Sequence, residues 1–329
     1  MATFKDIAER CNTSTATVSY VLSGRGEERR ISPAMCEQII AAAKDLNYHY
    51  TPKTKKNTAT RIAVFWPQKH LDMLMPSFIE GMNSALFMST SEVEVSIHPY
   101  ERGLLRNQRA LWTYGSFASA VVVSAAAPDL DTLASEMTLV PTVLLNRTLP
   151  GYMSVSIDQE EAGSMAAEYA MSHGKDDIAI VMPAANLHGA VTRGNAAIEA
   201  CRQKGYDISQ NVVLCNNDVD DGYATAQRMI MNRSLKKVIL CIYDIVAFGI
   251  ISALTEAGIK VGEDVEVICM STSHDRLFSR IYPGMTMIDM RQAEVANMGI
   301  NLAIDAAVNG RRDPKSIILH PQFINRRYV

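Results

Sequence analysis

A run of hydroxyl-bearing residues near the start of the chain could supply several hydrogen bonds from one short segment, CNTSTATVSYVLSG at residues 11–24. With Ser14 as N-cap and about 100° per residue thereafter, Val18, Val21 and Leu22 fall within one narrow arc. The opposite side carries small or hydrogen-bonding residues, namely Ala16, Ser19, Tyr20 and Ser23. Such a face suits DNA, because small side chains allow close approach and hydroxyls can bond bases or phosphates.

Helix signals on both sides of this segment predict a compact helical unit in residues 1–50. Thr3 followed by Asp6 is an N-cap pattern, and Ser32-Pro33 starts a further helix. The apolar residues expected to pack together are Phe4, Ile7, Ala8, Cys11, Met35, Ile39, Ala42 and Leu46. Asn12 stands where a tight turn needs a left-handed backbone. The pattern predicts a helix-turn-helix, whose second helix fits the major groove, but it also allows a three-helix bundle with a solvated Ser/Thr face.

The rest of the chain alternates short apolar runs with longer stretches of helical periodicity, which is typical of α/β folds. The predicted strands are 61–66, 93–99, 118–124, 142–146, 178–183, 212–216, 238–242 and 265–270. The predicted helices are 76–90, 104–114, 129–136, 159–173, 188–204, 221–233 and 245–257. Two successive blocks of this kind predict two doubly wound parallel-sheet lobes, with ligands at the carboxyl ends of the strands.

The distribution of charge and the length of the longest apolar stretch indicate which kinds of partner this chain can bind. Residues 1–61 carry ten Lys and Arg against six Asp and Glu, whereas the remainder carries 22 against 29. A basic head before an acidic body favours a polyanion as partner of the head. The longest apolar stretch, 245–254, is about half of a bilayer span, and MATFKDIAER is not a signal peptide, so no membrane partner is expected. The six cysteines form no CxxC pair and predict buried, reduced thiols in a cytoplasmic protein.

The sequence contains no complete motif for catalysis, metal binding or nucleotide binding. It has no nucleophile elbow, no phosphate-binding Gly-rich loop after a strand, and no metal-ligand spacing among its seven His. NNDVDDG at 216–222 resembles a calcium loop, but Asp221 and Gln227 occupy the positions of its Gly and Glu. Asp220 or Asp221 is instead expected to cap the next helix. We therefore expect no enzyme activity, no cofactor and no metal ion.

Several long segments of the chain resemble the LacI/GalR-type family of bacterial transcription regulators. The N-terminal match consists of TFKDIAERCNTSTATVSYVLSG at 3–24 and RISPAMCEQIIAAAKDLNY at 30–48. Later matches are PTVLLNR, VSIDQEEAGSMAAEYAMSHGKDDIAIV, DIVAFGIISALTEAGIKVGEDVEVICM and HPQFINRR. The resemblance implies an all-α helix-turn-helix domain at 1–50, a linker at 51–60, and a periplasmic-binding-protein-like core at 61–329. It places lobe 1 at about 61–157 and 290–318, and lobe 2 at about 158–289 and 319–329.

The resemblance also assigns DNA contacts. Base-reading positions fall on Thr15, Ala16 and Tyr20. Candidates for phosphate contacts are Ser14, Thr17, Ser19, Ser23, Arg29, Lys53, Lys55 and Lys56, with Arg25 and Arg30 in the same loop as Arg29. Many members have Arg where this chain has Tyr20, and Tyr offers one hydroxyl and a ring instead of a guanine-binding fork. The linker lacks the Leu that family members insert into the minor groove, so we do not expect such a wedge here.

In the family, a small effector binds between the two lobes. The matched or nearby candidates for effector binding are Trp66, Phe78, Ser124, Arg147, Val191, Arg193, Tyr243, Asp244 and Ser271. Val191 stands where sugar-responsive members carry Arg, Tyr243-Asp244 replaces an Asn-Asp pair, and Ser271-Thr272 replaces an Asp-Asp pair. Because sugar hydroxyls are bound by such groups, a less hydroxylated or more apolar effector, or none, is expected.

The resulting expectation is a sequence-specific transcription regulator, most simply a repressor, which binds a palindromic operator as a homodimer under control of a small molecule. One alternative keeps DNA binding but replaces the effector with a protein co-regulator. A second alternative is a solute-binding or enzymatic α/β protein whose first 50 residues are only a helical appendage.

Overall fold

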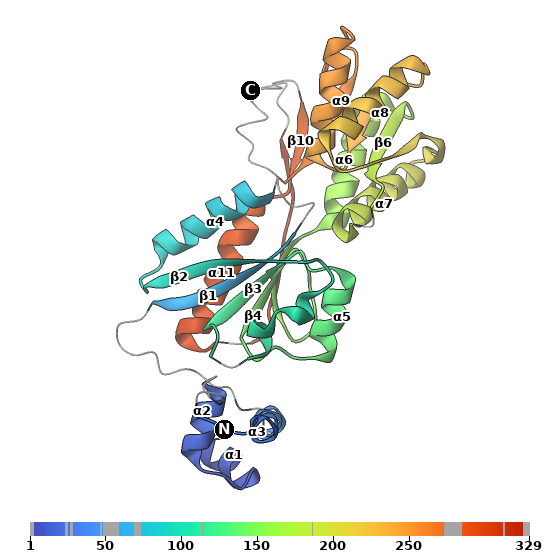
Figure 1. Ribbon diagram of the computed structural model, residues 1–329. Coiled ribbons are helices and arrows are strands. Elements are labelled where there is room, and N and C mark those ends of the chain that lie inside the picture. Colours follow the sequence, from blue (N-terminus) through green and yellow to red (C-terminus); the bar gives the residue numbers. More distant parts are fainter. Residues whose placement is uncertain are drawn as a thin grey trace. The chain divides into compact units, whose positions relative to one another are not determined.

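The computed structural model describes residues 3–23, 26, 29–46, 48, 59–68, 74–113, 115–185, 187–272, 285–311 and 313–324. The chain divides into two compact units. The first comprises Met1–Gln68, Ser84–Val155 and Met298–Ser316, and the second comprises Lys69–Asn83, Ser156–Asn297 and Ile317–Val329. The α/β parts of both units are drawn in Figure 1.

Three short helices form the N-terminal head: α1 (Phe4–Arg10), α2 (Thr15–Leu22) and α3 (Pro33–Asp45). Their starts are capped by Thr3, Ser14 and Ser32, as the sequence predicts. Asn12 has φ +47° in the turn between α1 and α2, which confirms the expected left-handed residue. Ile7, Val18, Leu22 and Ile39 are fully buried in the shared core. The helix-turn-helix prediction for this segment is therefore confirmed.

A six-stranded sheet, most of which belongs to the first unit, has the order β11-β5-β4-β3-β1-β2. Its strands are β1 (Thr60–Pro67), β2 (Val93–Tyr100), β3 (Ser119–Val123), β4 (Thr142–Leu145), β5 (Met153–Ile157) and β11 (Ser316–Leu319). Strands β1 to β5 pair in parallel. One face packs against α5 (Ala127–Ser135), with Phe65 and Leu133 in the same core. On the other face, the Ser119 hydroxyl donates to the carbonyl of Ala303 in α11 (Gln292–Asn309) at 2.7 Å.

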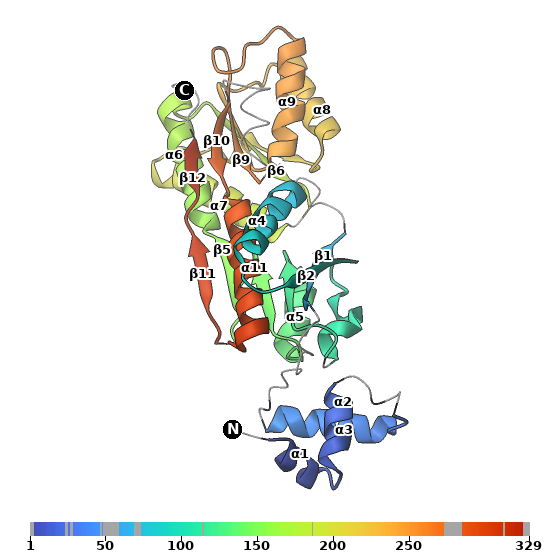
Figure 2. The ribbon, with the colours of Figure 1, turned by 90° about the vertical axis from the view of Figure 1, so that its left-hand side faces the viewer.

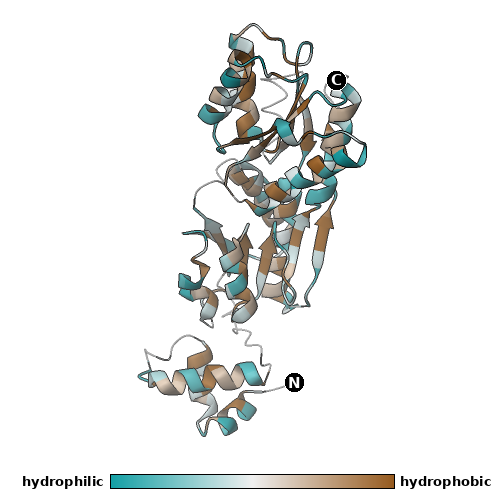
Figure 3. Ribbon diagram, turned by 90° about the vertical axis from the view of Figure 1, so that its right-hand side faces the viewer, coloured by the Kyte–Doolittle hydropathy of each residue, from teal (hydrophilic) through white to brown (hydrophobic). Residues whose placement is uncertain are grey.

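The second unit is built on a sheet in the order β12-β10-β9-β8-β6-β7. Its strands are β6 (Ile178–Pro183), β7 (Val212–Cys215), β8 (Val238–Cys241), β9 (Glu266–Ser271), β10 (Thr286–Asp289) and β12 (Gln322–Ile324). All pairs are parallel except β10 with β12, which lie next to each other in Figure 2. Helices α6 (Gln159–Gly174) and α7 (His188–Gln203) form one pair, and α8 (Val219–Met231) and α9 (Asp244–Glu256) form another. Figure 3 shows the apolar residues concentrated on the strands of both sheets.

Helices α4 (Leu74–Met88) and α11 pack closely, because Gly81 lies against Ala293 and Ala296. The Asn297 amide also donates to the Gly81 carbonyl at 3.4 Å. The domain and lobe boundaries expected from the sequence remain predictions.

Two local predictions were wrong. A helix was expected over 104–114, but this segment contains two 3-10 turns, Leu105–Asn107 and Arg109–Trp112. The buried Asp129 carboxylate accepts the backbone N–H groups of Gly103 and Leu105, which favours a turn instead of a regular helix. Helix α8 is capped by Asp218, whose carboxylate accepts the Asp221 N–H at 2.7 Å, and not by Asp220 or Asp221.

Candidate nucleic-acid interface and effector-binding residues

The second helix of the head separates its residues sharply by burial. Val18, Val21 and Leu22 lie in the core of the head, whereas Thr15 and Ala16 at the start of α2 are exposed. Ser19 and Tyr20 are half-buried on the next turn. Since small residues stand at the exposed start and a ring stands one turn later, this face can approach a DNA groove closely.

The hydroxyls at the ends of α2 have partners within the head. Ser14 Oγ accepts the Thr17 N–H at 3.0 Å and lies 2.8 Å from Thr17 Oγ1. Ser23 Oγ donates to the Tyr20 carbonyl at 3.1 Å. These three residues therefore stabilise the ends of the helix.

The loop after α2 is closed by a backbone hydrogen bond from the Ile31 N–H to the Gly26 carbonyl at 2.9 Å. Arg29 is exposed on this loop, and its guanidinium carbon lies 4.8 Å from the centre of the Tyr20 ring. Arg30 is also exposed and has φ +55°. The expected contacts Lys53, Lys55 and Lys56, and Arg25, lie outside the described residues.

In the first unit, three expected effector-binding residues lie at the carboxyl edge of the sheet. Trp66 is buried near the end of β1, and Ser124, with φ +47°, follows β3. Arg147 follows β4, and its Nε donates to the Ala125 carbonyl at 2.9 Å. Asn146 Nδ2, which sequence reasoning missed, lies 3.5 Å from Ser124 Oγ. This edge is where doubly wound sheets bind ligands.

In the second unit, Arg193 of α7 is buried although it is a charged residue. Its guanidinium donates to Gln159 Oε1 at 2.7 Å and to the Ile242 carbonyl at 3.3 Å, and it lies 5.2 Å from the Tyr243 ring centre. Burial lowers the pKa of Arg193, while the neighbouring Tyr243 and Asp244 raise it. Gln159 was missed because nothing in the sequence near α6 marks it as a partner of α7.

Asp244 and Ser271 are buried side by side at the carboxyl edge of the same sheet. Asp244 Oδ2 accepts the Thr272 N–H at 2.8 Å and lies 3.4 Å from Ser271 Oγ, while Oδ1 accepts the Ile245 N–H at 2.9 Å. This carboxylate therefore organises the end of β9 and the start of α9. The half-buried Val191 lies on α7, and the buried Phe78 lies on α4.

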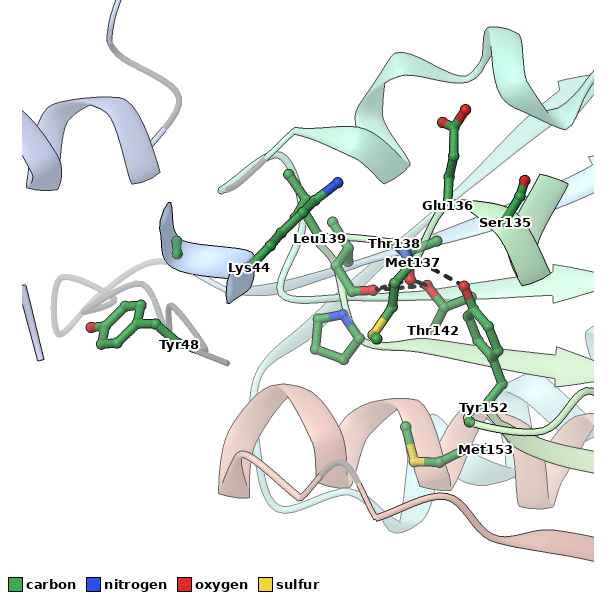
Figure 4. A pocket seen from close by; sticks show the side chains of 14 residues that line it. Lys44, Tyr48, Ser135, Glu136, Met137, Thr138, Leu139, Thr142, Tyr152 and Met153 are labelled. Carbon is green, nitrogen blue, oxygen red and sulfur yellow. Dashed lines mark hydrogen bonds between the residues drawn. The ribbon is translucent and has the colours of Figure 1, made fainter. Parts of the chain in front are cut away.

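Figure 4 shows a pocket whose lining includes residues between α5 and β4. The Thr138 N–H donates to the Tyr152 hydroxyl at 3.3 Å, and that hydroxyl donates to the Leu133 carbonyl at 3.0 Å. Burial raises the pKa of Tyr152. Because Thr142 begins β4, these residues lie at the amino end of the strand, away from the edge where such sheets bind ligands.

Metal and membrane features are absent from the part of the chain that the structure describes. There, no group of three or more His, Cys, Asp or Glu side chains is arranged to hold a metal ion. None of the described helices is long and apolar enough to cross a membrane.

Comparisons with known proteins match both parts of the chain. Residues 3–50 match the family described as "Bacterial regulatory proteins, lacI family", and residues 167–327 match the "Periplasmic binding protein-like domain". The HTH-type transcriptional repressor PurR of Escherichia fergusonii is 26% identical to this chain over 349 residues, covering 100% of this chain and 97% of that protein.

Solved structures agree on the fold. A LacI family transcription regulator from Clostridium acetobutylicum superposes with a TM-score of 0.75 and 23% identity, over 81% of this chain and 99% of that one. The lac repressor dimer bound to operator and the anti-inducer ONPF superposes with a TM-score of 0.67 and 18% identity, over 99% of this chain and 98% of that one. The expected architecture, a helix-turn-helix domain with a two-lobed α/β core, is therefore confirmed.

Proposed function

Because this chain joins the lacI-family helix-turn-helix domain to a periplasmic-binding-protein-like domain, as LacI-family regulators do, we propose that it is a sequence-specific DNA-binding transcription repressor. The observation that carries the proposal is the face of α2. Thr15 and Ala16 are exposed at its start and Tyr20 follows one turn later, while the opposite face is fixed in the core of the head. This arrangement suits a recognition helix in the major groove.

The repressor acts as a homodimer on a palindromic operator, with half-sites about one helical turn of DNA apart. Large apolar side chains on the outside of both units support self-association. Phe87 and Met88 at the end of α4 are 89% and 74% exposed, and Leu214 on the edge strand β7 is 62% exposed. Burying such side chains against a second copy would be favourable.

A small effector regulates this repressor by binding at the carboxyl edges of the sheets. The residues proposed at these edges are the Tyr243 ring beside the buried Arg193 in the second unit and, separately, Trp66 and Arg147 in the first. These groups favour a planar or anionic molecule with few hydroxyls. The binding shifts the balance between two arrangements of the core, which requires different effector affinities for the two. A protein co-regulator is the alternative.

The protein acts without catalysis, in the cytoplasm. None of the six cysteines forms a disulfide bond, which suits a reducing compartment, and burial raises the pKa of Cys215 to about 11, which suits an unreactive thiol. The relative in Escherichia fergusonii, a repressor, supports a regulatory role over an enzymatic one.

Selection of bound sequences from random duplex DNA, with the full chain, tests the proposal. We expect a palindromic consensus that binds about 10³–10⁷-fold more tightly than random DNA, with affinity that falls steeply as salt rises. No enriched sequence, or binding that does not respond to salt, would contradict DNA-directed function. Repeating the selection and a thermal-shift screen with metabolites then separates a small effector from a protein co-regulator.

A further inference from the structure

The contact between Tyr20 and Arg29 joins the recognition helix to the loop that follows it. The Arg29 guanidinium carbon lies 4.8 Å from the centre of the Tyr20 ring, within the distance of a cation–π contact. Tyr20 is half-buried on α2, and Arg29 is exposed. Among the described residues, no carboxylate lies within ion-pair distance of Arg29. Within this part of the chain, the Tyr20 ring is the observed contact of the Arg29 guanidinium.

Contacts of Gly26 and Ile31, on either side of Arg29, fix the backbone near this residue. The Ile31 N–H donates to the Gly26 carbonyl at 2.9 Å and closes the loop around Arg29. Gly26 is buried, and a Cβ atom there would lie 2.8 Å from Cys36 Sγ, which only a glycine avoids without a shift. Since Gly26 packs on Cys36 and is bonded to Ile31, and Arg29 contacts the Tyr20 ring, Arg29 loses less conformational freedom on binding than a free side chain would.

A guanidinium is planar, and a contact through its carbon with a ring face leaves N–H groups that can point away from the ring. This leaves its fork able to donate two parallel hydrogen bonds to one acceptor pair. In the major groove, guanine O6 and N7 form such a pair. A phosphate also offers two acceptor oxygens, but it lies on the DNA backbone and not at the base edges. Tyr20 lies on the groove-facing side proposed for α2, so the group stacked on it lies near base edges.

We propose that Arg29, positioned by the Tyr20 ring, reads a guanine in each operator half-site. Arg29 is the base-reading residue, and Tyr20 is its positioning residue. This inference rests on the proposed DNA-binding function, because it names which base that function recognises.

The test uses the full chain and the duplex obtained by selection from random DNA, with every base pair substituted in turn. Arg29→Ala should reduce discrimination at one G·C pair per half-site by roughly 5- to 150-fold and leave the other positions unchanged. Arg29→Lys should restore it only in part, because an ammonium can donate to guanine O6 and N7 but lacks the planar fork that the Tyr20 ring positions. Tyr20→Phe should keep the preference, whereas Tyr20→Leu should lose it.

A double variant and a charge control complete the design. Tyr20→Leu combined with Arg29→Ala should lose no more discrimination than Arg29→Ala alone, because both changes remove the same contact. Lys5→Ala removes one positive charge from α1 of the head and should leave the base preference intact. Circular dichroism of each variant checks that the helices remain folded.

Three results would overturn the inference. An unchanged base preference in Arg29→Ala would show that Arg29 reads nothing. Equal losses on selected and random DNA, with a salt slope lower by about one, would make Arg29 a phosphate contact. Full discrimination in Tyr20→Leu would remove the positioning role. Failure to select any sequence would instead contradict the proposed function itself, so the two failures are distinguishable.

Discussion

The Asp244 carboxylate accepts the Thr272 backbone N–H at 2.8 Å, and this bond ties the start of α9 to the end of β9. Both residues follow parallel strands, which brings them to the same edge of the sheet although 28 positions separate them in the chain. The carboxylate is buried and holds the backbone at an edge where an effector is proposed to bind.

Loss of this carboxylate should destabilise the second unit. Asp244→Ala leaves the N–H groups of Thr272 and Ile245 without their acceptor, which should cost about 1–3 kcal/mol of unfolding free energy. Urea unfolding of the full chain measures this loss. Glu168→Ala, at an exposed position of α6, is the control and should change stability by less than about 0.5 kcal/mol. Equal effects of the two variants would contradict the role given to Asp244.

Close packing of α8 and α9 depends on two glycines that lie against each other's helix. A Cβ atom at Gly249 would overlap the Val219 carbonyl, and one at Gly222 would overlap the Val246 carbonyl. Gly249→Ala should therefore lower stability by about 1–3 kcal/mol despite the better helix propensity of Ala. Ser252→Ala, on the exposed side of α9, should have little effect. Thermal unfolding measures the stability of both variants. A Gly249→Ala variant that is more stable than the parent protein would show that the two helices can separate without a loss of stability.

His320 should titrate above its usual range. The Glu161 carboxylate lies 2.6 Å from His320 Nδ1, and this hydrogen bond raises the pKa of the imidazole above 6.5. Its contribution to stability is complete below the unfolded pKa and is lost as pH rises through the higher folded pKa. An NMR titration of the ring protons measures the value. In Glu161→Gln the pKa should return toward 6.5, and no change in that variant would exclude the pair as the cause.

Two variants of Ser14, the N-cap residue of α2, should distinguish its effect on stability from its effect on DNA binding. Ser14→Ala removes the acceptor of the Thr17 N–H and should destabilise the head by about 0.5–2 kcal/mol. Ser14→Asp restores a good cap but places a negative charge beside the proposed DNA backbone, so it should fold normally and bind the selected duplex more weakly. Thermal melting and a DNA titration measure the two effects. Tight binding by a folded Ser14→Asp variant would place Ser14 away from phosphates.

Local chemistry was sufficient to predict the head and most of the parallel strands. Capping at Thr3, Ser14 and Ser32 and the turn at Asn12 depend on neighbouring backbone groups, so the sequence shows them directly. Buried parallel strands such as Ile178–Pro183 are continuous apolar runs and are equally visible.

Tertiary structure decided the features that depend on residues far apart in the chain. The sequence analysis did not predict the edge strands β11 and β12 or the helix α11, because these elements depend on the sheets against which they pack. The turns after residue 104 follow from bonds to Asp129, and the burial of Arg193 depends on Gln159 and the Ile242 carbonyl. The helix pattern predicts that Tyr20 lies on the outer face of α2, but it does not predict the contact with Arg29, which depends on the folded chain. Periodicity encodes which face of an element is buried, whereas partners across the fold are set only when the chain packs.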